Sequence, residues 1–207
     1  MNKSFCVPGL EEEKKFWQAG YVSVAGCDEV GRGAWAGPVS VGVVVVPSER
    51  RINRVRDSKM LTEAERERLY GRILEWCLDW SVGHALPQEC DEFGMSEAQR
   101  RAAQQALAGL SDIPDYVLVD GRWDFMQTGR VKTIVGGDRY CLSIAAASVV
   151  AKVTRDQLMR RLAESYPEYD FASNKGYHSP KHKEALQQLG PTPIHRQSWS
   201  FMEKLRP

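Results

Sequence analysis

The sequence has few of the residues that build disulfide frameworks or cysteine-based metal sites. Its five cysteines are an odd number, they are scattered along 207 residues, and no two of them are spaced as Cys-x-x-Cys. This usage excludes a disulfide scaffold and a zinc site of the usual cysteine type. It favours reduced thiols, so we expect a cytoplasmic protein.

Long apolar segments and a strong net charge are also missing. The longest strongly apolar run, residues 39–46, is far too short to span a bilayer. Residues 1–20 contain no apolar core of a signal peptide, so we expect no membrane association. The formal net charge is only +1, so a nucleic-acid partner would require the basic residues to be concentrated on one face.

The hydrophobic pattern predicts one domain in which strands and helices are mixed. Apolar runs bounded by turn residues predict strands at 21–27, 37–46, 81–86, 115–120 and 131–135. The first two runs are about ten residues apart, which suggests antiparallel neighbours. The second is apolar without alternation at its end, which is typical of a strand covered on both faces.

Helix signals fall between and after these strands. Thr62 and Glu65 form a capping box, and the helix it opens carries an apolar stripe. Its members are Leu69, Ile73, Trp76, Cys77 and Trp80. Further helices are predicted from Pro87, over 96–110, over 143–165 and over 180–189. The loop 49–56 contains four arginines, for which a solvated surface is the favoured interpretation.

Acidic residues follow three of the predicted strands. Asp28 and Glu29 end the first, Asp120 ends the fourth, and Asp138 follows the fifth. Adjacent strand residues point to opposite faces, so Asp28 and Glu29 converge only if the backbone bends there. Four carboxylates in one pocket repel one another unless cations compensate, and Mg²⁺ and Mn²⁺ prefer oxygen ligands. The pattern indicates a two-metal phosphodiesterase site, although acids after strands also serve as ordinary turn and cap residues.

A series of motifs then narrows the interpretation. In order, they are Gly26-Cys-Asp-Glu-Val-Gly-Arg-Gly33 with Gly37-Pro38, Asp57-Ser58-Lys59, Val119-Asp120-Gly121, Gly137-Asp138, residues 143–148 and 151–156, Lys175-Gly176-Tyr177, and His195-Arg196. This order, over nearly the whole chain, resembles the type 2 ribonuclease H family. The resemblance implies an α/β, ribonuclease-H-like fold with a central mixed five-stranded sheet flanked by helices and a small helical C-terminal part. It places the catalytic core at about 21–165 and the extension at about 166–207.

The resemblance also implies an activity. It implies endonucleolytic cleavage of the RNA strand of RNA–DNA hybrids, and incision 5′ to single ribonucleotides embedded in duplex DNA. The products would carry 3′-hydroxyl and 5′-phosphate ends, and the cofactor would be Mg²⁺ or Mn²⁺. We expect a monomer whose partners are hybrids and ribonucleotide-containing duplex DNA.

Residue roles follow from the matched motifs. By resemblance, Asp28, Glu29, Asp120 and Asp138 are the catalytic, metal-binding acids. Gly31, Arg32 and Gly33 match the loop that contacts the ribonucleotide. Tyr177 matches the tyrosine that packs against the sugar and helps to detect the 2′-hydroxyl, the group that distinguishes RNA from DNA. Ser58 and Lys59 either contact phosphate or belong to an ordinary turn before the helix.

Several positions leave alternatives open. The family usually has a lysine where this chain has Gly136, which affects the assignment of Asp138. Asp156 is expected to have a structural role rather than a catalytic one. For His178 and His182, four residues apart, a surface position is favoured over metal binding. His195 and Arg196 either line the substrate groove or pack the C-terminal segment.

Three other functions are compatible with parts of the pattern. A type 3 ribonuclease H shares much of the catalytic domain, but only about twenty residues precede the first predicted strand here, which favours type 2. A junction resolvase is disfavoured by the Gly-Arg-Gly loop and Tyr177. A catalytically inactive hybrid-binding module is disfavoured by the full set of four acids.

Overall fold

The protein is built around a mixed five-stranded sheet, as expected. The computed structural model describes residues 7–55 and 58–205. Its strands are β1 (Val24–Val30), β2 (Val39–Val46), β3 (Asp79–Ala85), β4 (Tyr116–Asp120) and β5 (Val131–Ile134). The spatial order is β3-β2-β1-β4-β5. The pairs β1–β2 and β2–β3 are antiparallel, whereas β1–β4 and β4–β5 are parallel.

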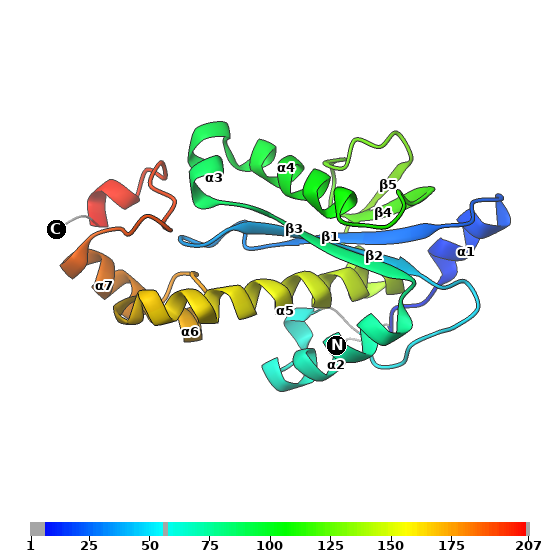
Figure 1. Cartoon of the computed structure of the whole chain (residues 1–207), viewed down its shortest axis with the longest axis horizontal. Helices are drawn as coiled ribbons and strands as arrows, with labels where there is room; N and C mark the ends of the chain where they lie inside the picture. Colours follow the sequence, from blue (N-terminus) through cyan, green and yellow to red (C-terminus); the bar gives the residue numbers. More distant parts are fainter. Residues whose placement is uncertain (1–6, 56–57, 206–207) are drawn as a thin grey trace, which may run out of the picture.

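Helices cover both faces of this sheet (Figure 1). On one face lie α3 (Pro87–Phe93) and α4 (Met95–Ala108), and on the other lie α2 (Glu63–Trp76) and the long α5 (Leu142–Ser165). The remaining helices are α1 (Glu11–Gln18), α6 (Phe171–Asn174) and α7 (Pro180–Leu189), and the 3₁₀ turns are η1 (Ser58–Met60), η2 (Gly137–Arg139), η3 (Pro167–Tyr169) and η4 (Met202–Leu205). No helix in the described residues has the length and apolar character needed to cross a membrane.

Strand β2 is buried on both faces because its valines serve two different cores. Val39, Val41, Val43 and Val45 join the alanines of α4 in one cluster, whereas Val44 and Val46 join α5 and α2 in another. This division follows the two-residue period of a strand. It explains why the sequence shows no polar alternation at these positions.

Helix α5 lies unusually close to the sheet because two strand residues under it are glycines. A Cβ atom at Gly26 would lie 2.0 Å from the Ser143 carbonyl carbon, and one at Gly42 would lie 2.9 Å from the Ala147 oxygen. Neither position can accept a side chain without moving the helix. The close approach brings Ser148 and Lys152 of α5 next to the carboxylates of β1.

The C-terminal residues form a third cluster against the far end of α5. Its buried members are Ala36, Met159, Tyr169, Phe171, Ala185, Leu186 and Met202. The cluster packs the region after Ser165 against the loop that follows β1.

Most predicted helix boundaries are confirmed, and one is wrong. The Thr62–Glu65 capping box is present, Gly94 separates α3 from α4, and Ser179 caps α7. Helix α2 ends at Trp76, however, so Cys77 is its C-cap and Trp80 belongs to β3, opposite Val44. The predicted apolar stripe extends past the end of the helix because helix and strand burial patterns cannot be distinguished over so few residues.

Candidate active site

The predicted acids of β1 lie where that strand loses one of its neighbours. The pairing of β4 with β1 stops at Cys27–Val119, one residue before Asp28 and Asp120. The expected bend at Asp28 and Glu29 is wrong, because β1 continues regularly to Val30 opposite β2. The two side chains therefore point to opposite faces of the sheet. Asp28 is hydrogen-bonded to Ser148 of α5, and Glu29 contacts Gln99 of α4.

A pocket of about 300 Å³ opens beside these two acids. It is lined by Asp28, Glu29, Val30, Ser58, Lys59, Ser148, Lys152 and Tyr177. Residues from β1, η1, α5 and the loop after α6 thus meet at one point, although they are up to 149 positions apart in the chain. Five of the eight were predicted as site residues from the sequence.

Asp120 and Asp138 lie at the edge of the same region. The amide of Gly137 donates to Asp120 Oδ1 at 2.8 Å, which ties η2 to the end of β4. Asp138 is buried, and one of its carboxylate oxygens lies 3.9 Å from Lys59 Nζ. Lys59 therefore lies between the pocket and the fourth acid.

The carboxylates affect one another electrostatically. Burial, followed by the charges of Glu29 and Asp120, raises the pKa of Asp28 well above its ordinary value. Burial and then the charge of Asp120 raise the pKa of Glu29. The hydroxyl of Ser148 and the ammonium group of Lys59 oppose the shift at Asp28. Burial and the neighbouring carboxylates thus both disfavour the ionised forms of Asp28 and Glu29.

The Gly31–Gly33 loop is held against Tyr177. The Gly31 amide donates to the Tyr177 hydroxyl at 3.0 Å. Arg32 donates to Gln99 Oε1 at 3.0 Å, and Gln99 Nε2 reaches Glu29 at 3.4 Å. Gly33 is exposed and has open space around it. Gly31 is thus tied to a pocket residue, Tyr177, and Arg32 is linked to Glu29 through Gln99.

Two buried arginines support this loop from below. Arg196 donates to the carbonyl oxygens of Gly31, Arg32 and Gly37 at 2.6–3.1 Å. Arg155 donates to the carbonyls of Ala36, Pro38 and Lys175 at 2.8–3.1 Å. Both guanidinium groups bind main-chain oxygens, so they position backbone and are not available to a ligand.

Known proteins are similar to this chain in sequence and in fold. A profile of the family described as Ribonuclease HII matches residues 25–202. The chain belongs to the ribonuclease HII family. A ribonuclease HII from Streptomyces avermitilis is 45% identical over 183 residues, covering 88% of this chain and 78% of the relative. The chain is therefore a ribonuclease H endonuclease, of a family that degrades the RNA of RNA–DNA hybrids.

Solved structures agree with the assignment. The ribonuclease H2 of Pyrococcus horikoshii has a TM-score of 0.75 and 32% identity, covering 89% of this chain and 97% of that one. Bst ribonuclease HIII, solved in complex with Mn²⁺, has a TM-score of 0.70 at 18% identity, covering 91% and 70%. The latter likeness shows the shared fold alone.

This ribonuclease HII has a donor set suited to hard divalent cations, but its carboxylates are spread apart. Within residues 7–55 and 58–205, no three His, Cys, Asp or Glu side chains are grouped closely enough to hold an ion as placed. The chemistry fits nonetheless, because the donors are carboxylate oxygens. The raised pKa of Asp28 also reflects a repulsion that a cation would relieve.

The serine and the lysine of the Asp57-Ser58-Lys59 motif both line the pocket. Ser58 is buried, and its hydroxyl is hydrogen-bonded to that of Ser148 at 2.8 Å. Lys59 is largely exposed, with its ammonium group toward Asp138. Asp57 lies outside the described residues.

Other sequence interpretations have clear outcomes. His182 is fully buried and bonded to His195, so its predicted surface position is wrong, whereas His178 is exposed. His195 and Arg196 pack the C-terminal segment instead of lining the pocket. Asp156 accepts a bond from Lys152 at 2.7 Å and so orients a pocket residue.

Gly136, at the position where the family usually has a lysine, has a φ of 67°. That left-handed conformation favours glycine. The departure from the family pattern is therefore matched by the backbone of the turn that precedes Asp138.

The functional residues that were missed are polar groups whose burial depends on tertiary packing. Gln99, fully buried between Arg32 and Glu29, had no sequence signal, because it lies in an alanine-rich helix among other glutamines. Arg155 and Arg196 lay inside the quoted motifs, but a motif does not say whether an arginine faces a ligand or the backbone. The backbone-binding role of these arginines could be recognised only from the structure.

Proposed function

We propose that this ribonuclease HII incises duplex DNA on the 5′ side of a single embedded ribonucleotide, in addition to degrading the RNA of hybrids. The observation that carries the proposal is the meeting of Asp28 and Glu29 with Tyr177 in one pocket, beside Asp120. A site that hydrolyses phosphodiesters is thereby adjacent to an aromatic side chain able to contact a sugar.

Asp28, Glu29, Asp120 and Asp138 would hold Mg²⁺ or Mn²⁺ in this proposal. Two such cations, when bound, supply an attacking water of lowered pKa and neutralise charge on the leaving 3′ oxygen. The products are a 3′-hydroxyl and a 5′-phosphate.

The chain's own side chains position the substrate. Lys59 and Lys152 line the pocket and provide positive charge for the scissile phosphate and its neighbour. The ring of Tyr177 packs against the ribose, and its hydroxyl, bonded to the Gly31 amide, places the Gly31–Gly33 backbone next to the 2′-hydroxyl. A deoxyribose lacks the group that completes these contacts, so its phosphate is held less well.

We also propose that the enzyme is a cytoplasmic monomer with a catalytic core at about 21–165 and a C-terminal extension at about 166–207. The thiols of Cys27, Cys77, Cys90 and Cys141 are free, which is typical of reducing compartments.

The experiment uses a labelled DNA duplex with one internal ribonucleotide and, separately, a hybrid whose RNA strand is labelled, with Mg²⁺ or Mn²⁺ titrated into metal-free enzyme. We expect cleavage that depends cooperatively on metal concentration and leaves ends that a DNA polymerase extends directly, which requires a 3′-hydroxyl. A hyperbolic dependence with a slope of one would contradict the two-metal proposal. Products that need phosphatase treatment before extension would contradict the proposed polarity.

A further inference from the structure

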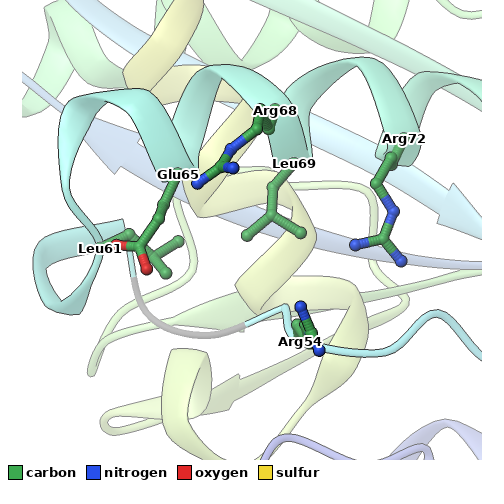
Figure 2. A pocket seen from close by; sticks show the side chains of 6 residues that line it. All are labelled: Arg54, Leu61, Glu65, Arg68, Leu69 and Arg72. Atoms are coloured by element: carbon green, nitrogen blue, oxygen red, sulfur yellow. The ribbon is translucent and has the colours of Figure 1, made fainter.

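A hollow outside the active site is lined by arginines (Figure 2). Its volume is about 430 Å³, and its walls are Arg54, Leu61, Glu65, Arg68, Leu69 and Arg72. Figure 2 shows Arg68 and Arg72 descending from α2 and Arg54 rising from the loop opposite, with Leu69 between them. Leu61 and Leu69 are buried and form an apolar floor, whereas the three arginines are exposed.

These arginines have little to neutralise them. Among the described residues, no ion pair joins Arg54, Arg68 or Arg72 to a carboxylate. Arg72 donates only to the Asn53 carbonyl, at 3.3 Å. Glu65, the one acid among the described residues that line this hollow, uses its carboxylate to cap α2 through Thr62. Exposed guanidinium groups that are not paired with carboxylates are suited to bind anions.

A second basic hollow continues the first. It is lined by Arg50, Arg51, Ile52, Asn53, Arg72, Glu75 and Trp76, and it shares Arg72 with the first hollow. We call Arg50, Arg51, Arg54, Arg68 and Arg72 the arginine strip. The chain as a whole carries a net charge of only +1, so five arginines beside two glutamates concentrate positive charge locally.

The first hollow lies next to the active site in the chain. Ser58 and Lys59 line the catalytic pocket, and Leu61, two residues later, lines the first hollow. Arg66 of α2 donates to the carbonyls of Ser58 and Leu61, at 2.9 and 2.5 Å, and so fixes this turn to α2. Residues 58–61, anchored by Arg66, therefore contribute to both the catalytic pocket and the first hollow.

We propose that the arginine strip binds the phosphodiester backbone of the same duplex whose scissile bond occupies the pocket, several nucleotides away from it. The site is suited to phosphates and not to bases. Among the described residues that line the two hollows, the only aromatic side chain is Trp76, which is buried and donates to the Arg50 carbonyl. Backbone contacts of this kind carry affinity and register without sequence preference. The inference rests on the proposed function and adds a second substrate contact to it.

The test compares Arg68→Ala/Arg72→Ala with a control of equal charge change, Lys14→Ala/Arg130→Ala. Lys14 lies on α1 and Arg130 immediately precedes β5, so both are exposed and lie away from the carboxyl ends of β1 and β4. Alanine is the best helix former, so the α2 variant should fold normally. Binding is measured by fluorescence anisotropy without metal, against salt, on a ribonucleotide-containing duplex that covers only the pocket and on one extended by about one helical turn of ten base pairs on each side.

We expect the wild-type protein to bind the longer duplex more tightly. In the strip variant, the slope of log Kd against log salt for that duplex should fall by about 1.8, because each lost phosphate contact removes about 0.9. The salt slope should change by less than half as much for the strip variant on the short duplex and for the control variant on either duplex.

An unchanged salt slope for the strip variant on the long duplex would overturn the proposal, as would an equal loss in the control. Failure of the wild-type enzyme to cleave either duplex would count against the proposed function instead. The metal-free binding arm would still decide whether the strip contacts the backbone.

Discussion

Single carboxylates in the pocket are in an environment that disfavours their charged forms. Asp28 is buried, and its pKa is raised by burial and by the charges of Glu29 and Asp120. Such repulsion costs stability in the metal-free protein, and it is the property that makes the site attract cations. Activity and stability should therefore respond in opposite directions when the charge is removed.

Asp28→Asn should reduce cleavage of a hybrid by at least about 100-fold, because even groups one shell removed from a metal typically cost 10–100-fold. The same change should raise the melting temperature in EDTA by about 2–4 °C, the response expected for roughly 1 kcal/mol in a chain of this size. Ser148→Ala serves as a comparison, since it removes a partner that favours the ionised Asp28 and leaves the charge. Near-normal turnover by a folded Asp28→Asn protein would refute the assignment.

Tyr177 makes two separable contributions, one from its ring and one from its hydroxyl. The ring lies beside Lys152 and Arg155, with the cations 5.6 and 5.3 Å from its centre, and the hydroxyl accepts from Gly31. We expect Tyr177→Ala to lower kcat/KM for a single embedded ribonucleotide at least about 10-fold more than for a long hybrid. Tyr177→Phe should give an intermediate loss, because a net hydrogen bond is worth about 1 kcal/mol. Equal losses on both substrates would remove Tyr177 from ribonucleotide selection.

At the scale of elements, the C-terminal segment positions the loop that follows β1. Arg196 binds three carbonyls of residues 31–37, and the adjacent His195 begins a chain of bonds that ends at Tyr177. The hydrogen-bond partners determine which ring nitrogen of each neutral histidine carries the proton. The Thr192 amide donates to His195 Nδ1, and His182 Nδ1 must donate to the Tyr177 carbonyl, so His195 Nε2 donates to His182 Nε2.

Arg196→Lys should destabilise the protein by about 2–4 kcal/mol. A lysine cannot serve three divergent carbonyls, and each buried acceptor left without a donor costs about 1–3 kcal/mol. Urea unfolding in EDTA measures the change, with the exposed Arg161→Lys on α5 as the matched control. A difference between the two variants below about 0.5 kcal/mol would contradict the positioning role of Arg196.

The buried histidine pair should make stability depend on pH. Burial lowers the pKa of His195 from 6.5 to about 4 and also lowers that of His182. Between these values the unfolded chain binds a proton that the folded chain does not, so stability falls as pH decreases from about 6.5 toward 4. The slope is up to about 1.4 kcal/mol per pH unit for each histidine. In His195→Gln the slope of unfolding free energy against pH should be shallower, and an unchanged slope would show that His195 does not contribute.

The strands, the main helices and the acids could be predicted because local sequence decides them. Strand β2 shows its burial as an unbroken valine run, and the capping box at Thr62 marks the start of α2. The buried polar groups could not be predicted in the same way. His182 looked like a surface residue on an exposed helix, and only the packing of residues 190–202 against α7 buries it. The bend expected at Asp28 failed because the early end of β4, a tertiary feature, opens the site instead.

At the scale of the whole molecule, the net charge is only +1, but negative and positive side chains are concentrated in separate, neighbouring regions. The carboxylates lie at the ends of β1 and β4, and the arginine strip lies along α2 and the loop before it. The long α5 passes from the sheet to the C-terminal cluster, so residues on it can align the pocket with the segment that supports Tyr177 (Figure 1). Helix α5 thereby connects the carboxylate pocket with the segment that contacts Tyr177.

The measurement that tests this arrangement most directly uses an end-labelled DNA duplex with one internal ribonucleotide. Wild-type protein with Mg²⁺ or Mn²⁺ should make a single cut on the 5′ side of that ribonucleotide. An all-DNA duplex, EDTA-treated enzyme and Asp28→Asn should give none. Absence of the cut under both metals, or equal cutting of the all-DNA duplex, would contradict the assignment of the carboxylates and Tyr177 to one ribonucleotide-selecting site.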